Sequence, residues 1–203
     1  MLCWTLRALA AAKVLLWENG LELRECVIAA RPEEFSLIET ISQSADLPFP
    51  IHLAEGGSTR QQSVHHAVKA ASGKWVMVHD AARPLASPQL FAAVCQTALQ
   101  QGAAIAALPA NDTVKCADKS TLAPIIKSTF DRRHIWLAQT PQVFDRETFL
   151  EALESAAQEH FQGTDCSSLM EWQGHQVALV SGESRNFKIT YREDLERAAM
   201  LLG

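Results

Sequence analysis

The stretch KWVMVHDAARP, residues 74–84, decides how the rest of the chain is interpreted. The apolar run WVMV, residues 75–78, has the length of a buried strand rather than of a helix. The chain then turns polar at Asp80, and Pro84 prevents regular strand pairing further on. In open α/β sheets, ligands bind just beyond the carboxyl ends of the strands. This placement of Asp80 and Arg83 therefore predicts a site for a divalent cation and an anionic group. Taken alone, an aspartate such as Asp80 would more often only begin a turn.

Helical and strand-like patterns alternate on both sides of this stretch. They predict helices at residues 2–17, 32–42, 63–71, 88–100, 146–158, 164–172 and 191–202, and strands at residues 26–30, 51–54, 75–78, 103–108 and 176–180. Thr190 and Glu193 have the spacing of a capping box at the start of the last helix. Such alternation predicts an α/β fold with a doubly wound, mostly parallel sheet.

Regular patterning is lost between Pro109 and Phe144. Residues 113–115 and 125–128 are β-prone but too polar for core strands, so they predict a protruding β-arm. No internal repeat or low-complexity linker divides the chain. We therefore expect residues 1–203 to form a single domain, with the arm at about residues 110–143.

The amino-acid composition indicates which broad class of protein this is. The chain has 203 residues, a net charge of −5 and 48% hydrophobic residues, as expected of a soluble globular protein. An acidic balance argues against nucleic-acid binding, and no apolar run is long enough to span a membrane. The five cysteines are odd in number and include no CxxC pair, so we expect reduced thiols and a cytoplasmic location.

Three further segments carry candidate binding residues. In GGSTRQQSV, residues 56–64, the glycines allow the backbone to approach a ligand closely, and the hydroxyl groups suit a base or a ribose. An ordinary turn before a helix has the same pattern. Arg132 and Thr140 of the predicted arm suit a phosphate group, or belong to a solvated basic turn. Lys188, just before the last helix, either neutralises a phosphate or is an ordinary surface residue.

Taken together, the segments GGSTRQQSV, VHDAARP, DRRHIWLAQTPQVF and RNFKIT resemble the 2-C-methyl-D-erythritol 4-phosphate cytidylyltransferase family. The resemblance runs from about residue 2 to residue 202 and implies a Rossmann-like nucleotidyltransferase fold. It also implies transfer of a cytidylyl group from CTP to the methylerythritol phosphate, with Mg²⁺ and release of pyrophosphate, in the non-mevalonate isoprenoid pathway. A homodimer formed through the arm is a further implication.

The same resemblance implies roles for individual residues. Cytidine would be contacted by Gly57, Ser58 and Ser63, with Ser58 standing where family members often have an acidic residue. Asp80 would bind the metal with the nucleotide phosphates. The residues that would hold the acceptor phosphate are Arg83, Thr113, Arg132, Thr140 and Lys188. Of these, Arg132 and Thr140 would come from the partner's arm, and Arg132 and Lys188 would be catalytic by positioning the phosphate for in-line attack.

The beginning of the sequence departs from the family pattern. The family starts with a strand, a Gly-rich loop and a Pro-Lys-Gln segment that wrap the CTP phosphates, whereas this sequence starts in the following helix. We therefore expect an N-terminally incomplete or a degenerate relative, with slow turnover and unpaired strand edges. Three interpretations stay open: the cytidylyltransferase named above, one for another polyol phosphate such as ribitol phosphate, or an inactive nucleotide-binding or dimerisation module.

Overall fold

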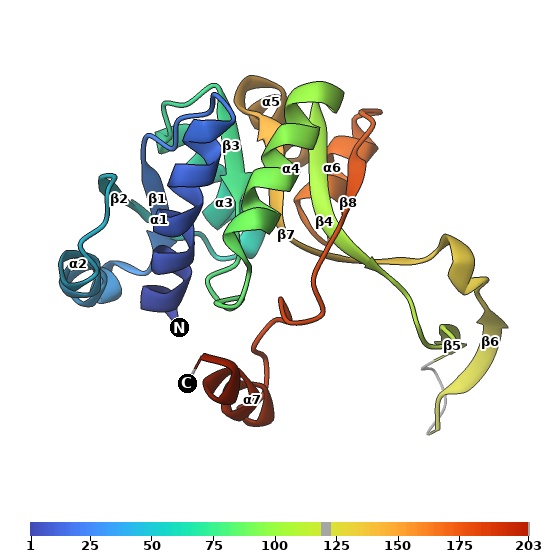
Figure 1. Cartoon of the computed structure of the whole chain (residues 1–203). Coiled ribbons are helices and arrows are strands. Elements are labelled where there is room, and N and C mark those ends of the chain that lie inside the picture. Colours follow the sequence, from blue (N-terminus) through green and yellow to red (C-terminus); the bar gives the residue numbers. More distant parts are fainter. Residues whose placement is uncertain (119–122, 203) are drawn as a thin grey trace.

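Helices and strands alternate along most of the chain, as the sequence predicts (Figure 1). The computed structural model describes residues 1–118 and 123–202, so residues 119–122 of the predicted arm and Gly203 lie outside the described residues. The elements are α1 Leu2–Glu18, β1 Cys26–Ala30, η1 Pro32–Glu34, α2 Phe35–Ser44, β2 Ile51–Glu55, α3 Arg60–Ala70, β3 Trp75–Val78, α4 Pro88–Gln101, β4 Ala103–Pro109, β5 Lys115–Asp118, β6 Ile125–Thr129, η2 Arg132–His134, β7 Trp136–Asp145, α5 Arg146–Gln158, α6 Cys166–Trp172, β8 Ala178–Ser181 and α7 Arg192–Leu202.

The strands of the body belong to two sheets. Within the described residues, β1 pairs in parallel with β2, and a four-stranded sheet has the order β3-β7-β4-β8. In that larger sheet β3, β4 and β8 run in the same direction and β7 runs against them. The predicted α/β class and the mostly parallel sheet are therefore confirmed.

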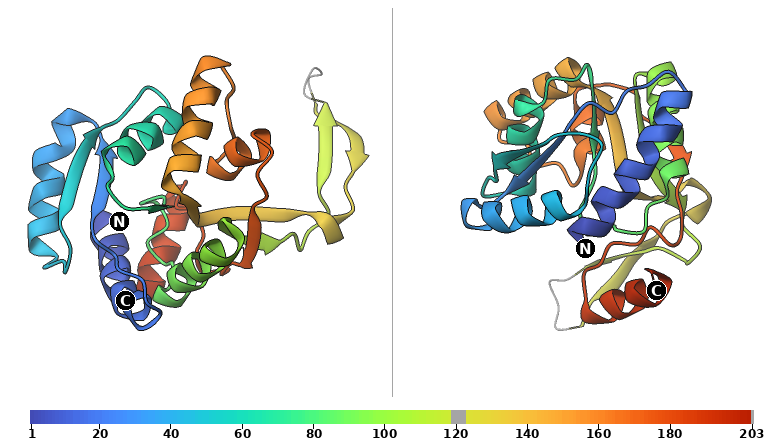
Figure 2. Two further views of the ribbon diagram at one scale, coloured as in Figure 1. Left: turned by 90° about the horizontal axis from the view of Figure 1, so that it is seen from above. Right: turned by 60° about the vertical axis from the view of Figure 1, so that its left-hand side comes forward.

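The four-stranded sheet separates two hydrophobic cores. Ile105 and Phe144 pack into a core with α5 and α6, whereas their neighbours Ala104 and Val143 pack into a second core with α1 and α4. This alternation follows from the two-residue period of a strand. Figure 2 shows α1 and α4 on one side of the sheet and α3 and α5 on the other. None of the described helices has the length and apolar character needed to cross a membrane.

β7 corrects the predicted extent of the arm. It pairs with both β3 and β4, and its residues 139–144 are buried. Gln142 is tolerated there because its amide is fully bonded. Its Nε2 donates to Asp165 Oδ2 (2.8 Å), and its Oε1 accepts from the backbone N–H groups of Cys166 and Ser167 (3.1 and 3.2 Å). The prediction that the arm continues to residue 143 is therefore wrong.

The arm itself, residues 111–118 and 123–135, projects from the body as predicted (Figure 1). Its strands β5 and β6 pair in antiparallel fashion, and β6 is exposed along its whole length. The arm exposes large apolar side chains, among them Ile125 (58% exposed), Ile126 (61%) and Phe130 (48%). Such surface on a protruding segment indicates an interaction face.

A large cavity lies beside β1 and β3. It has a volume of about 920 Å³, and apolar side chains of α1, β1, α3 and β3 line it, including Leu6, Ile28, Val64 and Val76. In the part of the chain that the structure describes, β1 pairs only with β2 and β3 only with β7. Each of these two strands therefore has one edge without a partner strand among the described residues.

At α3 and α7 the starts of the helices differ from the prediction because of capping side chains. α3 begins at Arg60, three residues before the predicted start, because the Thr59 hydroxyl accepts from the backbone N–H of Gln62 (3.2 Å). At α7 the capping carboxylate is Asp194 rather than Glu193, since Asp194 Oδ2 accepts from two backbone N–H groups before the helix (3.0 and 2.9 Å). Side-chain capping of this kind stabilises helix starts.

The five cysteines are free thiols, as predicted. Burial raises the pKa of Cys26 to about 11, with a smaller contribution from the Glu25 charge. Burial also raises the pKa of Cys95 to about 12. Both thiols are therefore protonated at neutral pH and are poor nucleophiles.

Candidate functional site

Asp80, just after the carboxyl end of β3, is the centre of the candidate site. Arg60 Nε and Nη2 donate to its Oδ1 (3.2 and 3.1 Å), and Lys188 Nζ donates to its Oδ2 (3.1 Å). Arg83 Nε lies 4.0 Å from the same Oδ2. Burial by itself raises the pKa of Asp80, but the charges of Arg60 and Lys188 outweigh burial and lower that pKa below its ordinary value. Asp80 is therefore ionised at neutral pH.

His79 fixes the turn that carries Asp80. His79 Nε2 lies 3.1 Å from the carbonyl oxygen of Arg83, which can only accept, so we assign the ring proton to Nε2. Nδ1 then accepts from the Thr140 hydroxyl (3.0 Å), and the Thr140 oxygen accepts from the Asp80 N–H (3.0 Å). Burial lowers the pKa of His79 to about 4. The ring is therefore neutral near pH 7 and holds this arrangement.

The segment that carries Lys188 is fastened to the same turn. The backbone N–H of Ile189 donates to the carbonyl of Ala82 (2.8 Å), and Arg83 Nη1 donates to the carbonyl of Asn186 (2.8 Å). The fully buried Asn186 in turn donates to the Thr140 carbonyl (2.8 Å). Lys188 thus reaches Asp80 from a backbone that three hydrogen bonds fix in place.

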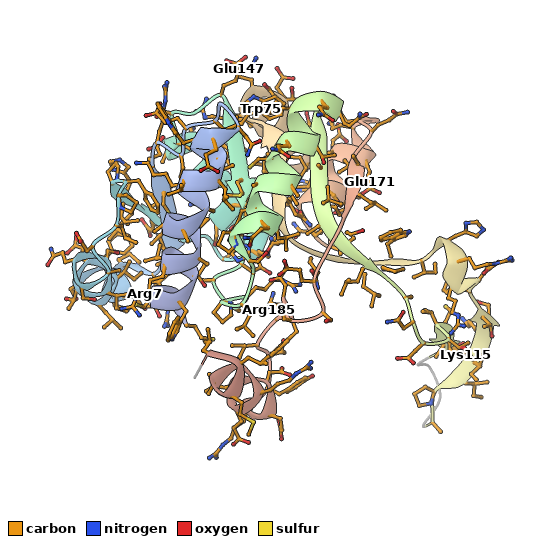
Figure 3. The ribbon with its side chains drawn as sticks, viewed as in Figure 1. Arg7, Trp75, Lys115, Glu147, Glu171 and Arg185 are labelled. Carbon is orange, nitrogen blue, oxygen red and sulfur yellow. The ribbon has the colours of Figure 1, made fainter. Side chains whose placement is uncertain are left out.

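A cavity of about 470 Å³ adjoins this cluster. Its charged lining residues are Arg60, Asp80, Arg83, Asp165, Glu171 and Lys188. Glu171 lies on α6, where Figure 3 labels it, and accepts from the Ser167 hydroxyl (3.0 Å). Cationic groups bind phosphate oxygens, whereas carboxylates accept hydrogen bonds from hydroxyl groups. The cavity therefore suits a small ligand that carries both a phosphate and hydroxyls.

The glycine loop, residues 56–59, is held by the first turn of α3. Ser63 Oγ accepts from the N–H of Gly57 (3.0 Å), and Gln62 Oε1 accepts from the N–H and hydroxyl of Ser58 (2.9 and 2.8 Å). Ser63 lines the 920 Å³ cavity, and both cavities share Arg60 and Asp80 in their linings. The loop and the Asp80 cluster therefore meet at Arg60.

Gly57→Ala is expected to destabilise the protein by about 1–3 kcal/mol, because a side chain does not fit there. A Cβ at Gly57 would lie 2.2 Å from Gln62 Cβ, so the loop or the helix must shift. Gly56→Ala is the matched control, since its Cβ would meet its nearest atoms at 3.4 Å. The free energy of unfolding of each variant, measured in urea, checks this. Equal stability of the two variants would contradict it.

Four of the predicted site residues come together in one chain: Asp80, Arg83, Thr140 and Lys188. Thr140, however, is not on the arm as predicted. It lies in β7, is 3% exposed, and uses its hydroxyl to bond His79 and Asp80. The placement of Thr140 on a partner's arm is therefore wrong, and its hydroxyl serves to position the Asp80 turn.

Thr113 and Arg132 lie on the arm, away from this cluster. Thr113 is exposed, and Arg132 Nη1 donates to the carbonyl of Asn111 within the arm. Neither is among the residues that line the 470 Å³ cavity. Figure 3 shows how far the arm projects, because Lys115 of β5 lies at the opposite end of the molecule from Arg7 of α1. Within one chain, the structure therefore does not bring these two residues to Asp80.

Sequence reasoning missed two contributors to the site, Arg60 and Gln142. In the structure Arg60 is the first residue of α3, where a basic side chain is unfavourable next to the helix dipole, but the predicted helix started only at residue 63 and this signal was hidden. Gln142 carries no comparable signal, because its partners at the start of α6 lie more than twenty residues away.

Comparison with known proteins agrees with this geometry. A family model described as "IspD: 2-C-methyl-D-erythritol 4-phosphate cytidylyltransferase" matches residues 1–203. The chain is 36% identical over 204 residues to the 2-C-methyl-D-erythritol 4-phosphate cytidylyltransferase of Thermosynechococcus vestitus, covering 100% of this chain and 82% of the relative. It is 49% identical over 154 residues to a bifunctional enzyme IspD/IspF of an Anaeromyxobacter species, covering 75% of this chain. The match spans only 40% of the length of that bifunctional relative.

A solved structure is similar over nearly the whole chain. It is the 4-diphosphocytidyl-2C-methyl-D-erythritol synthase of Anaerococcus prevotii, with a TM-score of 0.81 and 28% sequence identity. The similarity covers 97% of this chain and 92% of the other. The fold expected from the sequence is therefore also the fold of this solved synthase.

Proposed function

The chain belongs to the 2-C-methyl-D-erythritol 4-phosphate cytidylyltransferase family, and from this membership we propose that it transfers a cytidylyl group from CTP to 2-C-methyl-D-erythritol 4-phosphate. The products would be 4-diphosphocytidyl-2-C-methylerythritol and pyrophosphate, on the non-mevalonate route to isoprenoids. The observation that carries the proposal is the Asp80 cluster, in which Arg60, Arg83 and Lys188 gather around one carboxylate beside a polar cavity.

The two substrates would occupy the two sides of this cluster. Gly57, Ser58 and Ser63 would hold the cytidine, since they form the loop that adjoins Arg60. Arg83 and Lys188 would hold the acceptor phosphate, because hydrogen bonds already fix the segments that carry them. A phosphate oxygen of the acceptor then attacks the α-phosphorus of CTP, and the bond from that phosphorus to the leaving pyrophosphate oxygen breaks. Fixed cationic groups accelerate such a step by stabilising the charge on the transferring group.

Mg²⁺ is the proposed cofactor, with Asp80 as its protein ligand. Among the described residues no group of three or more His, Cys, Asp or Glu side chains is arranged to hold a metal. Mg²⁺ usually needs only one or two carboxylates where substrate phosphates complete its coordination. The single ionised Asp80 therefore fits an ion that arrives with CTP, and the bound ion would neutralise phosphate charge.

A homodimer would explain why Thr113 and Arg132 lie far from their own Asp80. The apolar side chains that the arm exposes gain stability only by packing on another surface, and a second copy of the chain is the commonest partner. In such a dimer Arg132 of the arm would reach the acceptor phosphate of the other subunit. The cytoplasm is the proposed location, because the five cysteines are free thiols.

The test of the proposal is a pyrophosphate-release assay on the purified protein. Release is expected only when CTP, Mg²⁺ and 2-C-methyl-D-erythritol 4-phosphate are all present. Ribitol 5-phosphate as the acceptor is expected to give a kcat/KM lower by at least about tenfold, because the cavity groups would be left without partners. A preference for ribitol 5-phosphate would favour the polyol alternative. Binding of CTP without turnover would favour the inactive module.

A further inference from the structure

Arg60 occupies a junction that no predicted role accounts for. It is the first residue of α3, directly after the glycine loop, and its side chain crosses to the end of β3. There its Nε and Nη2 donate to Asp80 Oδ1 (3.2 and 3.1 Å), while its Nη1 points to Cys166 Sγ at the start of α6 (3.4 Å). Arg60 also lines both cavities. One guanidinium therefore connects the end of β3 with the start of α6 and borders both cavities.

Around the Asp80 carboxylate itself, positive charges outnumber negative ones. The other two carboxylates of the cavity lining, Asp165 and Glu171, accept hydrogen bonds from uncharged groups at the start of α6 and from Gln142. Arg60, Arg83 and Lys188 bring three positive charges to the single negative charge of Asp80. The amino-terminal end of α3 adds the positive pole of the helix dipole, and the first turn of α3 has no acidic residue. The cations next to Asp80 therefore attract a further anion, since this one carboxylate does not balance them.

One edge of the guanidinium has only a weak partner. A thiol sulfur is a poor hydrogen-bond acceptor compared with a phosphate oxygen. Burial, the largest effect, raises the pKa of Cys166 to about 11 although Arg60 opposes it, so the sulfur carries no negative charge at neutral pH. Arg60 Nη1 would therefore form a stronger hydrogen bond to a phosphate oxygen than it forms to Cys166 Sγ.

We propose that Arg60 is a phosphate-binding residue, which pairs with Asp80 in the free site and transfers its guanidinium to a CTP phosphate when the nucleotide binds. This role rests on the proposed nucleotide chemistry. The transfer releases Asp80 Oδ1, the oxygen that Arg60 otherwise occupies, for the divalent cation that accompanies the nucleotide. Arg60 thereby makes cation binding at Asp80 depend on the arrival of phosphate.

The test measures binding of two probes by calorimetry, without turnover. Arg60→Gln is expected to bind inorganic tripolyphosphate, in the absence of divalent cations, at least about tenfold more weakly than the wild type. The same variant is expected to bind Mg²⁺ alone at least about tenfold more tightly, because its competitor for Asp80 is gone. The affinities of Arg60→Lys for tripolyphosphate and for Mg²⁺ should lie between those of the wild type and those of Arg60→Gln. Arg192→Gln, on the exposed α7, is the matched control and should behave as the wild type.

Each outcome separates the two proposals. Wild-type affinity for tripolyphosphate in Arg60→Gln would overturn the role of Arg60 as a phosphate ligand and leave the proposed reaction standing. Unchanged Mg²⁺ affinity would overturn the exchange at Asp80. Failure of the wild type to bind either tripolyphosphate or CTP would overturn both. Thermal melting of all variants confirms that the comparison is between folded proteins, and Arg60→Lys keeps the test valid if the glutamine variant does not fold.

Discussion

Asp80→Asn is expected to lower the turnover number of cytidylyl transfer by about 10²–10³-fold. Asparagine keeps the size of the side chain and an oxygen that accepts from Arg60 or Lys188, so the turn after β3 should persist. What is lost is the one negative charge at the centre of three cations. The variant also loses the proposed protein ligand for Mg²⁺, so raising the Mg²⁺ concentration should recover little of the rate.

The measurement for Asp80→Asn is kcat at saturating CTP and acceptor across a Mg²⁺ titration. Asp46→Asn is the matched control, because Asp46 is exposed in the loop after α2 and its positive φ of 45° is one that asparagine readily adopts. Its rate should equal that of the wild type. If Asp80→Asn keeps a wild-type rate and the same Mg²⁺ dependence, Asp80 is not the metal ligand.

Arg132→Ala and Lys188→Ala are each expected to lower kcat by at least about tenfold, and a mixture of the two inactive proteins should regain activity. In a dimer with exchanged arms, the mixed species has one site with its own Lys188 and the partner's intact Arg132. Random mixing makes about half of the dimers mixed, and in each mixed dimer one of the two sites is complete. About a quarter of wild-type activity should therefore return.

The control for this mixing experiment is Arg133→Ala, the neighbour of Arg132 on the same exposed turn. Among the described residues Arg133 pairs only with Asp131 of the arm, and this exposed ion pair should contribute little. Its variant should therefore be active without mixing. If subunits exchange, as mass spectrometry of labelled chains can establish, and no activity returns, Arg132 does not act across the dimer.

Local sequence patterns were sufficient to place most elements. The apolar run 75–78 is β3 residue for residue, and the strand at residues 26–30 is β1, because short apolar runs next to turn residues have few alternatives. Asp80, Arg83 and Lys188 were also found as candidates, although a turn at Asp80 and an ordinary surface position for Lys188 stayed open while each motif was taken alone. The motifs then linked these residues to one family.

What the sequence by itself determined is therefore the set of elements, the family and the acidic centre of the site. Only the tertiary structure decided that residues 136–145 form an internal strand, that the hydroxyl of the buried Thr140 bonds His79, and that Arg60 reaches Asp80. The physical reason is common to all three. A polar side chain looks solvent-exposed in sequence, and whether it is buried depends on hydrogen-bond partners that only the folded chain brings within reach.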